Sequence, residues 1–308
     1  MLLARAEWEA KFSGYYKGEA GFCVPMSGQT YLGIGGPADV IVSPEDPLSV
    51  KNIMLISRRN GYPVCTLGGG TNILVRDGGI EGVIVKLSQF RRIEVISQDE
   101  TDVTIFVEAG AGLQRLVAFC RDGGYAGVEG LAGIPGTVGG AICGNAGSFG
   151  FEIRDVIESV VIMNSDAELN RYGAEDLGFG YRHADIAAGD VVLSANLKVK
   201  RDDPEAVAAR TAGFLERKKA SQPVAERSAG CVFRNPVGLS AGKLIDEAGC
   251  KGMRAGGIEV SSVHANFFVN RGGGTAADYL RLMEDVALVV EKKHGVRLEP
   301  EITIIGEA

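Results

Sequence analysis

Apolar and polar residues recur along the chain with two different periods, one typical of helices and one typical of strands. Apolar residues three or four positions apart, ended by glycine or before proline, predict helices at 47–61, 113–124, 202–222, 241–249 and 275–295. The last helix begins with a Thr275/Asp278 capping box and ends at Gly295. Runs rich in β-branched and aromatic residues predict strands at 39–43, 62–67, 82–87, 91–97, 103–110, 156–164, 191–200, 257–262, 265–270 and 301–306.

The order of these elements predicts three domains. Residues 1–85 alternate a helix with short strands, which is typical of an α+β or α/β unit. Strands dominate residues 86–204, and the helix that stops before Pro223 marks the boundary to a third unit, residues 205–308. A chain of 308 residues exceeds the size at which one hydrophobic core stops growing, so more than one domain is expected.

Composition and charge exclude several classes of protein. Hydrophobic residues make up 45% and charged residues 23% of the chain, as in an ordinary globular protein. The net charge of −7 and the scattered Lys and Arg residues argue against nucleic acid or an anionic membrane as a partner. The N-terminal segment carries charges every few residues, so no signal peptide is expected. Every apolar run is far shorter than the roughly 20 residues of a membrane-spanning helix.

The cysteines and histidines predict no metal site. The six cysteines are widely spaced and contain no Cys-x-x-Cys pair, which indicates free thiols in a reducing cytoplasm. The three histidines, His183, His264 and His294, also lie far apart and lack metal-ligand spacing. We therefore expect a cytoplasmic protein without a bound metal.

Glycine-rich loops carry the first sign of function, since 44 glycines are about twice the usual share. The loop at 33–40 contains the dinucleotide pattern G-x-G-x-x-A, but Pro37 lies in the turn and a strand follows, so a Rossmann site is not expected. The loop at 66–79 can form either an anion-binding nest for a diphosphate or a plain hairpin or bulge loop. The loop at 130–150 is long, small and almost uncharged, which suits a segment laid against a flat ligand.

Seven motifs along the chain point to a known family. In order they are "LGGGTNILVRDGG", "VEGLAGIPGTVGGAICGNAG", "FGYR", "SAGCVFRNP", "AGKLIDEAGCKG", "VSSVHANFFVN" and "LEPEITIIG". Together they resemble the family of UDP-N-acetylenolpyruvoylglucosamine reductases, enzymes that make a peptidoglycan precursor. The resemblance extends from about residue 30 to the C-terminus.

The resemblance implies an α+β fold and a division of the chain. It implies a two-domain FAD-binding fold of the vanillyl-alcohol-oxidase (PCMH) type, with FAD-binding subdomains at 1–85 and 86–204. A C-terminal α/β substrate-binding domain would follow at 205–308, and its last strand, 301–308, would pack back near the flavin. The short connection between Arg182 and Ser221 resembles the compact type of the family, which lacks an extra tyrosine-bearing insertion.

The resemblance also assigns the glycine-rich loops to a non-covalently bound FAD. The positions implied to hold its pyrophosphate are Gly68, Gly69, Gly70, Thr71 and Asn72, with Gly35 and Gly36 nearby. Those implied to line the isoalloxazine and adenosine portions are Ile134, Pro135, Gly136, Thr137, Gly139, Gly140, Asn145 and Ala146. Cys143 stands where some relatives with covalently bound flavin have a cysteine, but no histidine lies in the second glycine-rich loop, so covalent attachment is not expected.

The implied reaction reduces an enolpyruvyl sugar nucleotide to UDP-N-acetylmuramate. NADPH would reduce FAD and leave, and the substrate would then enter the same cleft. Hydride would pass from flavin N5 to the β-carbon, and a proton must reach the α-carbon. The motif places Cys231 as the proton donor, and a thiol with a reference pKa of about 8.5 is protonated at neutral pH and more acidic than a hydroxyl. From the residues alone, Cys231 could instead be a small buried hydrophobe.

Two charged residues complete the implied catalytic set. Arg182 would hold the carboxylate of the enolate, for which its planar fork is better suited than lysine. From the residues alone, Arg182 could instead be a surface arginine at the end of a strand. Glu301 would polarise the enol or the carboxylate through hydrogen bonds. Glu299 stands two residues earlier, and the family pattern favours Glu301.

The remaining motifs imply contacts to the substrate. The implied substrate-binding residues are Tyr181, Arg234, Asn235, Lys243, His264 and Asn266, with Ser262 in the same motifs. Arg234 and Asn235 resemble the positions that contact the UDP diphosphate and uracil, whereas His264 could equally be a core histidine. The segment "YRHADI" lacks the serine that often follows the Tyr-Arg pair in the family, which leaves the fine substrate contacts there open.

Two other classes of protein remain as alternatives. An FAD oxidase or dehydrogenase acting on an alcohol would keep the glycine-rich loops but would not need "SAGCVFRNP" or the terminal carboxylate. A flavin-binding protein without catalysis would use Cys231 only for packing. The expected partner is the small UDP-sugar, and a monomer is expected.

Overall fold

The computed structural model describes residues 3–308, and the chain divides into two compact units. Unit 1 contains the N-terminal segment up to Phe22, Asp39–Gly69 and Gly82–Arg217. Unit 2 contains Cys23–Ala38, Gly70–Glu81 and Lys218–Ala308. Each unit is therefore built from separate stretches of the chain, and the last division falls within helix α5 (Pro204–Ser221).

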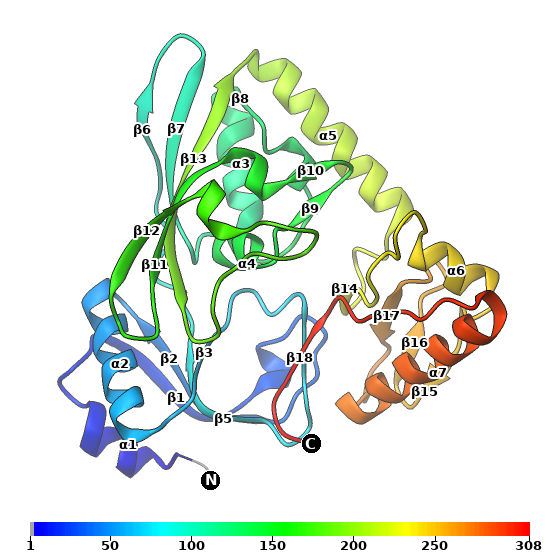
Figure 1. The fold of residues 1–308 in the computed structure, drawn as a ribbon, viewed down its shortest axis with the longest axis horizontal. Coiled ribbons are helices and arrows are strands. Elements are labelled where there is room, and N and C mark those ends of the chain that lie inside the picture. Colours follow the sequence, from blue (N-terminus) through cyan, green and yellow to red (C-terminus); the bar gives the residue numbers. More distant parts are fainter. Residues whose placement is uncertain (1–2) are drawn as a thin grey trace. The chain divides into compact units, whose positions relative to one another are not determined.

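The first sheet has four strands in the order β1–β2–β5–β3, and most of its residues lie in unit 1 (Figure 1). Its strands are β1 (Gly18–Pro25), β2 (Pro37–Pro44), β5 (Ile80–Val85) and β3 (Val64–Thr66). Helix α2 (Pro47–Asn60) connects β2 to β3. It begins where the Asp46 carboxylate accepts a hydrogen bond from the Ser49 N–H at 2.7 Å, and it ends at Gly61, whose φ is 71°.

Helix α1 (Arg5–Phe12) is not predicted by the pattern of apolar residues. Its stability comes from two rings one turn apart, because Trp8 and Phe12 are buried and stack with centroids 3.7 Å apart. The Trp8 indole N–H also donates a hydrogen bond to the Tyr16 hydroxyl at 3.2 Å. Trp8 and Phe12 have the spacing of one helical turn, but a single pair in eight residues is too short a pattern to predict a helix.

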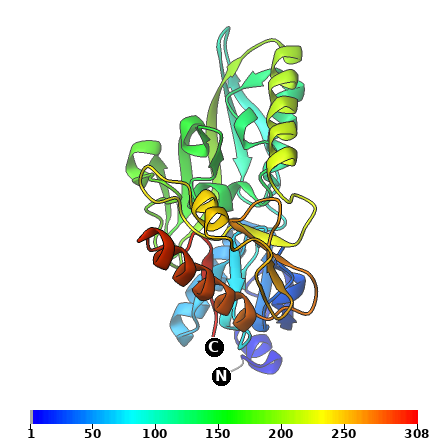
Figure 2. The same ribbon diagram turned by 90° about the vertical axis from the view of Figure 1, so that its right-hand side faces the viewer.

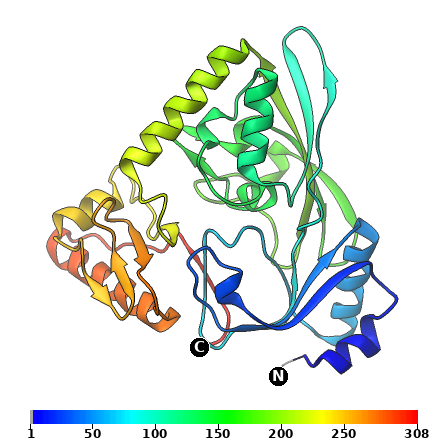
Figure 3. The ribbon, with the colours of Figure 1, turned by 180° about the vertical axis from the view of Figure 1, so that it is seen from behind.

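The second sheet lies in unit 1, with its strands in the order β12–β11–β13–β7–β6 and with β8 paired to β13. Its strands are β6 (Ile93–Gln98), β7 (Asp102–Glu108), β8 (Tyr125–Ala126), β11 (Ile157–Met163), β12 (Leu169–Gly173) and β13 (Val191–Arg201). Neighbouring strands in it are antiparallel. Helices α3 (Leu113–Gly123) and α4 (Val138–Cys143) lie on one side of the sheet (Figures 1 and 3), and α4 contacts β7 and β13.

One apolar core joins the two sheets of unit 1. It extends from Val40 and Ile53 beside the first sheet to Ile105, Val160 and Leu197 in the second. Strand β7 alternates buried and partly exposed residues, as a strand with one face on a core does. The two sheets therefore hold one another through a shared hydrophobic interior.

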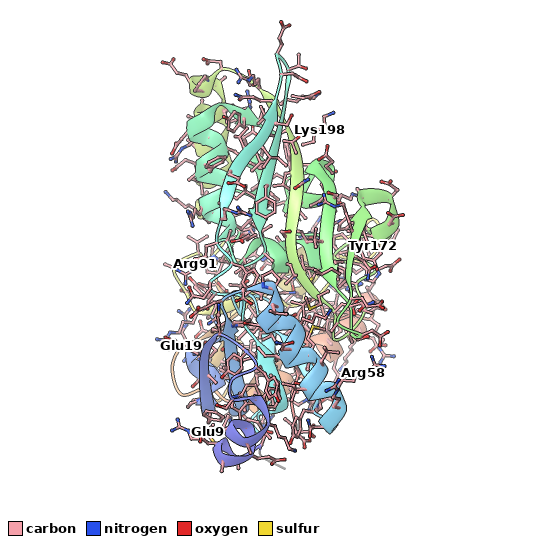
Figure 4. All side chains as sticks on the ribbon, turned by 90° about the vertical axis from the view of Figure 1, so that its left-hand side faces the viewer. Glu9, Glu19, Arg58, Arg91, Tyr172 and Lys198 are labelled. Atoms are coloured by element: carbon pink, nitrogen blue, oxygen red, sulfur yellow. The ribbon has the colours of Figure 1, made fainter. Side chains whose placement is uncertain are left out.

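The outer surface of unit 1 mixes charges of both signs. Figure 4 shows Glu9 on α1, Glu19 on β1, Arg58 on α2 and Lys198 on β13 with their side chains at the surface. The Lys198 ammonium lies 3.5 Å from the Asp102 carboxylate and is 53% exposed. Exposed pairs of this kind contribute about 0–1 kcal/mol each and leave the surface charge dispersed.

Unit 2 is built around a sheet in the order β14–β17–β16–β15, all antiparallel. Its elements are β14 (Ser228–Cys231), α6 (Ala241–Glu247), β15 (Arg254–Ala255), β16 (Ile258–Val260), β17 (Phe267–Asn270) and α7 (Ala276–His294). Helix α7 packs against β15 and β16 and contacts α6, as Figure 2 shows. Figure 3 shows the same strands from behind.

A parallel pair of short strands also belongs to unit 2. Strand β18 (Thr303–Ile305), near the C-terminus, pairs with β4 (Ile73–Val75), which follows the second glycine-rich loop. Leu74 and Ile302 are buried in the same apolar core as Phe268 and Val286. The last strand is therefore held next to a segment far away in the sequence.

All the predicted helices and strands are confirmed, including the capping box of Thr275 and Asp278 and the left-handed Gly295 that ends α7. Helix α1 and strands β1, β4, β8, β12, β14 and β15 were not among the predictions, nor was the two-stranded hairpin within residues 147–152. Within the described residues 3–308, no helix is long and apolar enough to span a membrane. The same residues contain no group of three or more His, Cys, Asp or Glu side chains that could hold a metal ion.

Candidate active site

The second glycine-rich loop requires glycine at two positions. A side chain at Gly68 would place its Cβ 2.7 Å from the Thr137 hydroxyl oxygen, within unit 1. A Cβ at Gly70, whose φ is 63°, would lie 2.3 Å from the Gln29 carbonyl oxygen in unit 2. Both distances are too short for a real Cβ. The loop therefore follows its neighbours at a distance that only glycine permits.

The third glycine-rich loop meets the second at this point. Thr137 is the N-cap of α4, and its hydroxyl accepts a hydrogen bond from the Gly140 N–H at 3.3 Å. The Gly139 N–H donates to the Ala109 carbonyl at 2.8 Å. The two loops thus converge at Gly68 and Thr137, in a region with little side-chain bulk and several backbone N–H groups.

Gln114, which sequence reasoning missed, fixes the start of the third loop. Its amide nitrogen donates hydrogen bonds to the carbonyls of Leu131 at 3.1 Å and Ile134 at 2.7 Å. Its amide oxygen accepts from the Gly133 N–H at 2.7 Å. One side chain on α3 therefore sets the turn just before Pro135. In the sequence, Gln114 cannot be distinguished from a polar residue on the solvent-facing side of an amphipathic helix.

The first glycine-rich loop packs on the segment after β4 in unit 2. The Gly36 N–H donates to the Arg76 carbonyl at 3.1 Å, and a Cβ at Gly36 would lie 2.1 Å from the Asp77 carbonyl oxygen. A Cβ at Gly35 would lie 2.8 Å from the Val75 Cβ. As the sequence predicts, strand β2 rather than a helix follows the loop, which does not fit a Rossmann site.

The structure brings the chain around Cys231 next to Glu301. Cys231 ends β14, is half-buried and pairs with Phe267 of β17. The Glu301 N–H donates a hydrogen bond to the carbonyl of Val232, the residue after Cys231, at 2.7 Å. The Glu301 carbonyl in turn accepts from the Asn72 amide at 3.4 Å. The backbone beside Cys231, the backbone of Glu301 and the side chain of Asn72 are therefore linked within unit 2.

Arg182 lies at the tip of a two-residue turn in unit 1. The Gly180 N–H donates to the His183 carbonyl at 3.0 Å, and the His183 N–H donates back at 3.2 Å. Arg182 has a φ of 54°, a left-handed conformation that favours glycine or asparagine. Its guanidinium donates to the Gly147 carbonyl at 2.9 Å and lies 5.2 Å from the centre of the Tyr181 ring. Arginine is strained in this conformation, and the contacts of the turn hold it there.

Lys243 and His264 line one cavity of about 210 Å³ in unit 2. Asp246 and Lys251 line it too, and the Lys251 ammonium lies 2.8 Å from the Asp246 carboxylate. Burial, and next the charge of Lys251, lower the pKa of His264. The His264 Nδ1 accepts from the Asn266 N–H at 3.2 Å, so a neutral ring carries its proton on Nε2. The cavity combines positive charge with a neutral donor, which suits an anionic ligand.

The side chains of Asn266 and Asn235 bind the protein itself. Asn266 is 2% exposed, and its amide accepts from the Phe233 N–H at 3.0 Å and donates to the Phe233 carbonyl at 2.7 Å. The Asn235 oxygen accepts from the Ala241 N–H at 3.0 Å, at the start of α6. Asn266 thus holds the stretch that follows Cys231 in place.

The predicted site residues fall into both units. Unit 1 contains Gly68, Gly69, Ile134, Pro135, Gly136, Thr137, Gly139, Gly140, Asn145, Ala146, Tyr181 and Arg182. Unit 2 contains Gly35, Gly36, Gly70, Thr71, Asn72, Cys231, Arg234, Asn235, Lys243, His264, Asn266 and Glu301. Within their units the structure brings Gly68 close to Thr137, bonds Glu301 to the backbone next to Cys231, and places Lys243 and His264 in one cavity. The roles of the individual residues stay predictions.

Comparison with known proteins identifies an FAD-binding region followed by a C-terminal domain of the same reductase family. Residues 38–173 match the FAD binding domain family, and residues 222–305 match the C-terminal domain of UDP-N-acetylenolpyruvoylglucosamine reductase. The reductase of that name from Geotalea uraniireducens is 41% identical over 94% of this chain and 95% of its own length. The one from Geobacter metallireducens is 40% identical over 98% of this chain and 99% of its own. The crystal structure of the reductase (MurB) from Thermus caldophilus aligns with a TM-score of 0.80 and 34% identity, over 94% of this chain and 99% of that one.

The chain belongs to the MurB reductase family. The resemblance, the α+β fold with an FAD-binding region and a MurB C-terminal domain, and the class of FAD-dependent oxidoreductase are thereby confirmed. The glycine-rich loops fit the flavin of the MurB family, because a Cβ at Gly68 or Gly70 would strike a neighbouring oxygen. Backbone N–H groups without side chains in front of them are the donors that a diphosphate requires.

Proposed function

We propose that the chain reduces the enolpyruvyl group of UDP-N-acetylenolpyruvoylglucosamine to UDP-N-acetylmuramate, with NADPH as electron donor. The observation that carries the proposal is the hydrogen bond of 2.7 Å that holds Glu301 to Val232, directly beside Cys231. A thiol that gives a proton and a carboxylate that polarises an enol need to be neighbours. An alcohol oxidase of the same superfamily needs neither.

FAD, bound without a covalent link, would supply the hydride for this reduction. Gly68 to Asn72 of the second glycine-rich loop and the loop around Thr137 would hold it. The close approach of Gly68 to Thr137 supports this role, since it keeps side chains away from the N–H groups. Gln114 would keep the turn before Pro135 in one shape.

Cys231 would deliver a proton to the α-carbon of the substrate. The residue before it, Gly230, has a φ of 79°, and no described atom outside Ala229 to Cys231 lies within 4 Å of the point where its Cβ would be. The backbone that precedes the thiol is therefore not covered at this point, which supports the approach of a ligand to this segment. A thiol is protonated at neutral pH and gives up its proton more readily than a hydroxyl, which suits a general acid.

Arg182 and Glu301 would stabilise the charge that develops on the substrate. The planar guanidinium of Arg182 can bind a carboxylate with two parallel hydrogen bonds. Its turn holds it in a left-handed conformation that is unfavourable for arginine, which supports a functional role. Glu301 would hydrogen-bond to the enol or its carboxylate from the strand next to Cys231.

The nucleotide part of the substrate would bind to unit 2. Lys243, Lys251 and His264 line a cavity together with Asp246, and their N–H groups are donors that a diphosphate can use. Arg234, Asn235 and Tyr181 are proposed to add further contacts to the substrate. We also propose the three sequence-based ranges as functional parts, with 1–85 and 86–204 binding FAD and 205–308 binding the substrate. A monomer in the cytoplasm is proposed, which the six free cysteines support.

An anaerobic visible spectrum tests the proposal directly. It is recorded on the purified protein, after NADPH, and after UDP-N-acetylenolpyruvoylglucosamine. Flavin bands that bleach with NADPH and return with the enolpyruvyl compound support the proposal. Bands that bleach and do not return favour an alcohol oxidase or dehydrogenase. A protein that cannot be reconstituted with FAD contradicts the role of the glycine-rich loops.

A further inference from the structure

Asn145 is a fully buried asparagine in the third glycine-rich loop, and the protein itself binds its side chain. Its amide nitrogen donates to the Glu152 carboxylate at 2.9 Å and to the Gly180 carbonyl at 2.9 Å. Its amide oxygen accepts from the Arg154 N–H at 3.4 Å. Both N–H bonds of the amide therefore have acceptors within unit 1. If Asn145 contacts the cofactor, as the sequence predicts, it would do so through its backbone.

The third glycine-rich loop contacts both the turn that carries Arg182 and the Arg182 guanidinium. Gly180, which accepts from Asn145, forms the base of the turn that carries Tyr181 and Arg182. The Arg182 guanidinium donates to the carbonyl of Gly147, two residues after Asn145, at 2.9 Å. The Asn145 side chain thus holds the base of the turn at Gly180, and the Gly147 carbonyl holds the Arg182 guanidinium.

Glu152 anchors Asn145 from the other side. It is the N-cap of the short helix η3 (Ile153–Val156), and it forms a capping box with Asp155. The Arg154 guanidinium lies 2.7 Å from the oxygen that also accepts from Asn145. In addition, Glu152 pairs with Gly147 in the hairpin of β9 (Gly147–Ser148) and β10 (Phe151–Glu152). Contacts other than the one with Asn145 therefore hold the Glu152 carboxylate in place.

Two residues of this hydrogen-bond network have a strained backbone. Arg182 has a φ of 54° and Asn145 a φ of 39°, both in the left-handed region. Such conformations persist in residues other than glycine only where the surroundings enforce them, and they cluster at functional sites. We infer that Asn145, anchored by Glu152, is a positioning residue that holds the Tyr181–Arg182 turn in the geometry that binds the substrate carboxylate. The inference rests on the proposed function, which gives Arg182 its role.

Two variants of Asn145 and one of Glu152 test this inference in the flavin-loaded enzyme. Asn145→Gly removes the amide and tolerates the left-handed backbone. Asn145→Asp keeps the volume but replaces the donor with a second carboxylate facing Glu152. Glu152→Gln keeps the shape of the anchor without its charge. Asn164→Ala is the matched control, because Asn164 also binds backbone in unit 1, through the Glu168 N–H at 2.9 Å, in a turn away from Arg182.

The readout is the ratio of two rates in the same preparation, flavin bleaching by NADPH and flavin reoxidation by the enolpyruvyl substrate. We expect Asn145→Gly and Asn145→Asp to slow reoxidation by about 10²-fold while bleaching stays near wild type, because small misplacements of a binding group cost about that much. A merely structural role would lower melting temperature and flavin content but would leave the ratio unchanged. Asn164→Ala is expected to keep the wild-type ratio.

A double-mutant cycle with Arg182→Ala shows whether Asn145 acts through Arg182. If it does, Asn145→Gly has little further effect once Arg182 is gone. Losses that multiply would overturn the inference, as would an unchanged ratio or the loss of flavin in all three variants. Failure of the proposed function looks different, since the flavin of the wild-type enzyme would then not be reoxidised by the substrate at all.

Discussion

The Asp77 carboxylate accepts a hydrogen bond from the backbone N–H of Ala276, the first residue of α7, at 2.9 Å. Its second oxygen accepts from the Ala277 N–H at 3.0 Å. Asp77 follows β4, whose partner β18 comes just after Glu301. A residue distant in sequence therefore caps the longest helix of unit 2 and ties it to the strand beside the predicted catalytic carboxylate.

We predict that Asp77→Ala destabilises the protein by about 1–2 kcal/mol, because two N–H groups at the helix N-terminus lose a charged acceptor. Asp77→Asn is expected to lose less, since one oxygen remains. Urea unfolding measures both. The control is Asp285→Ala, an exposed carboxylate on the same helix that lies 4.0 Å from Arg281 and is expected to change stability little. Equal effects of Asp77→Ala and Asp285→Ala would contradict the capping role.

Replacement of the proposed proton donor separates the two halves of the reaction. We predict that Cys231→Ala still allows NADPH to bleach the flavin but slows reoxidation by the enolpyruvyl substrate by about 10²–10⁴-fold, the usual contribution of a general acid. Cys231→Ser is expected to retain partial activity, because a hydroxyl is a weaker acid that can still transfer a proton. Stopped-flow absorbance measures both rates, with the exposed Cys23→Ser as control. An unchanged second rate would remove Cys231 from the mechanism.

Arginine at position 182 matters for its shape as well as its charge. We predict that Arg182→Lys slows the same half-reaction, since an ammonium cannot form two parallel hydrogen bonds with a carboxylate. Arg182→Gly should slow it further. Its backbone strain is relieved, however, so its free energy of unfolding is expected to stay within about 1 kcal/mol of wild type. Half-reaction kinetics and urea unfolding test the two statements, and normal turnover of Arg182→Lys would count against the assigned role.

Local signals explain how much of the fold the sequence could predict. Helix α7 carries its own capping box and a terminal Gly295, and β7 alternates apolar residues, so both are predictable from neighbours in sequence. Helix α1 depends on the stacking of Trp8 and Phe12, and one pair of apolar residues four apart is too short a pattern to predict a helix. Strand β4 is short and takes its partner, β18, from the other end of the chain.

The candidate site shows the same limit. Motifs pointed to Cys231, Arg182 and Glu301 as the predicted catalytic residues, because family patterns are defined by residue types. They did not point to Gln114, whose side chain binds backbone groups about twenty residues away, or to Glu152, whose carboxylate accepts from the Asn145 side chain. Backbone groups have no residue type, and a single side-chain contact in a loop has no periodic pattern, so neither is evident from the sequence. The strained φ of Arg182 was equally hidden, since the sequence "GYRH" carries no glycine where the left-handed residue stands.

Tyr279 allows a test of an unusual buried group. It is fully buried on α7, and among the described residues its hydroxyl has no hydrogen-bond partner. Burial, and next the nearby Cys231, raise the pKa of Tyr279, which therefore stays neutral. We predict that Tyr279→Phe keeps or raises the free energy of unfolding, by up to about 1 kcal/mol.

The contrasting variant for Tyr279→Phe is Tyr16→Phe. It removes a hydroxyl that accepts a hydrogen bond from the Trp8 indole at 3.2 Å, and it is expected to destabilise by about 1 kcal/mol. Urea unfolding compares the two. A marked loss in Tyr279→Phe would mean that its hydroxyl has a partner, such as a buried water, that stabilises the fold.

The half-buried His264 makes stability depend on pH on the acid side. Its pKa is lowered in the folded state by burial, and next by Lys251, so the unfolded chain takes up the proton first as pH falls below about 6.5. The wild-type free energy of unfolding should therefore fall with pH from that point, by at most about 1.4 kcal/mol per pH unit for one proton, until the folded state is protonated too. Above about pH 6.5, His264 is neutral in both the folded and the unfolded state, so it does not make the free energy of unfolding depend on pH.

The variant that isolates this effect is His264→Gln, which cannot titrate. Other groups also respond to acid, including Glu259, whose pKa is lowered by hydrogen bonds from Arg271, so the quantity to compare is the wild-type stability minus that of the variant at each pH. We predict that this difference is constant above about pH 6.5 and falls below it. Urea unfolding across the range measures the difference. A difference that stays flat in acid, or that rises, would mean that His264 is not held neutral in the folded protein and that the cavity beside Lys243 offers a charged imidazolium instead.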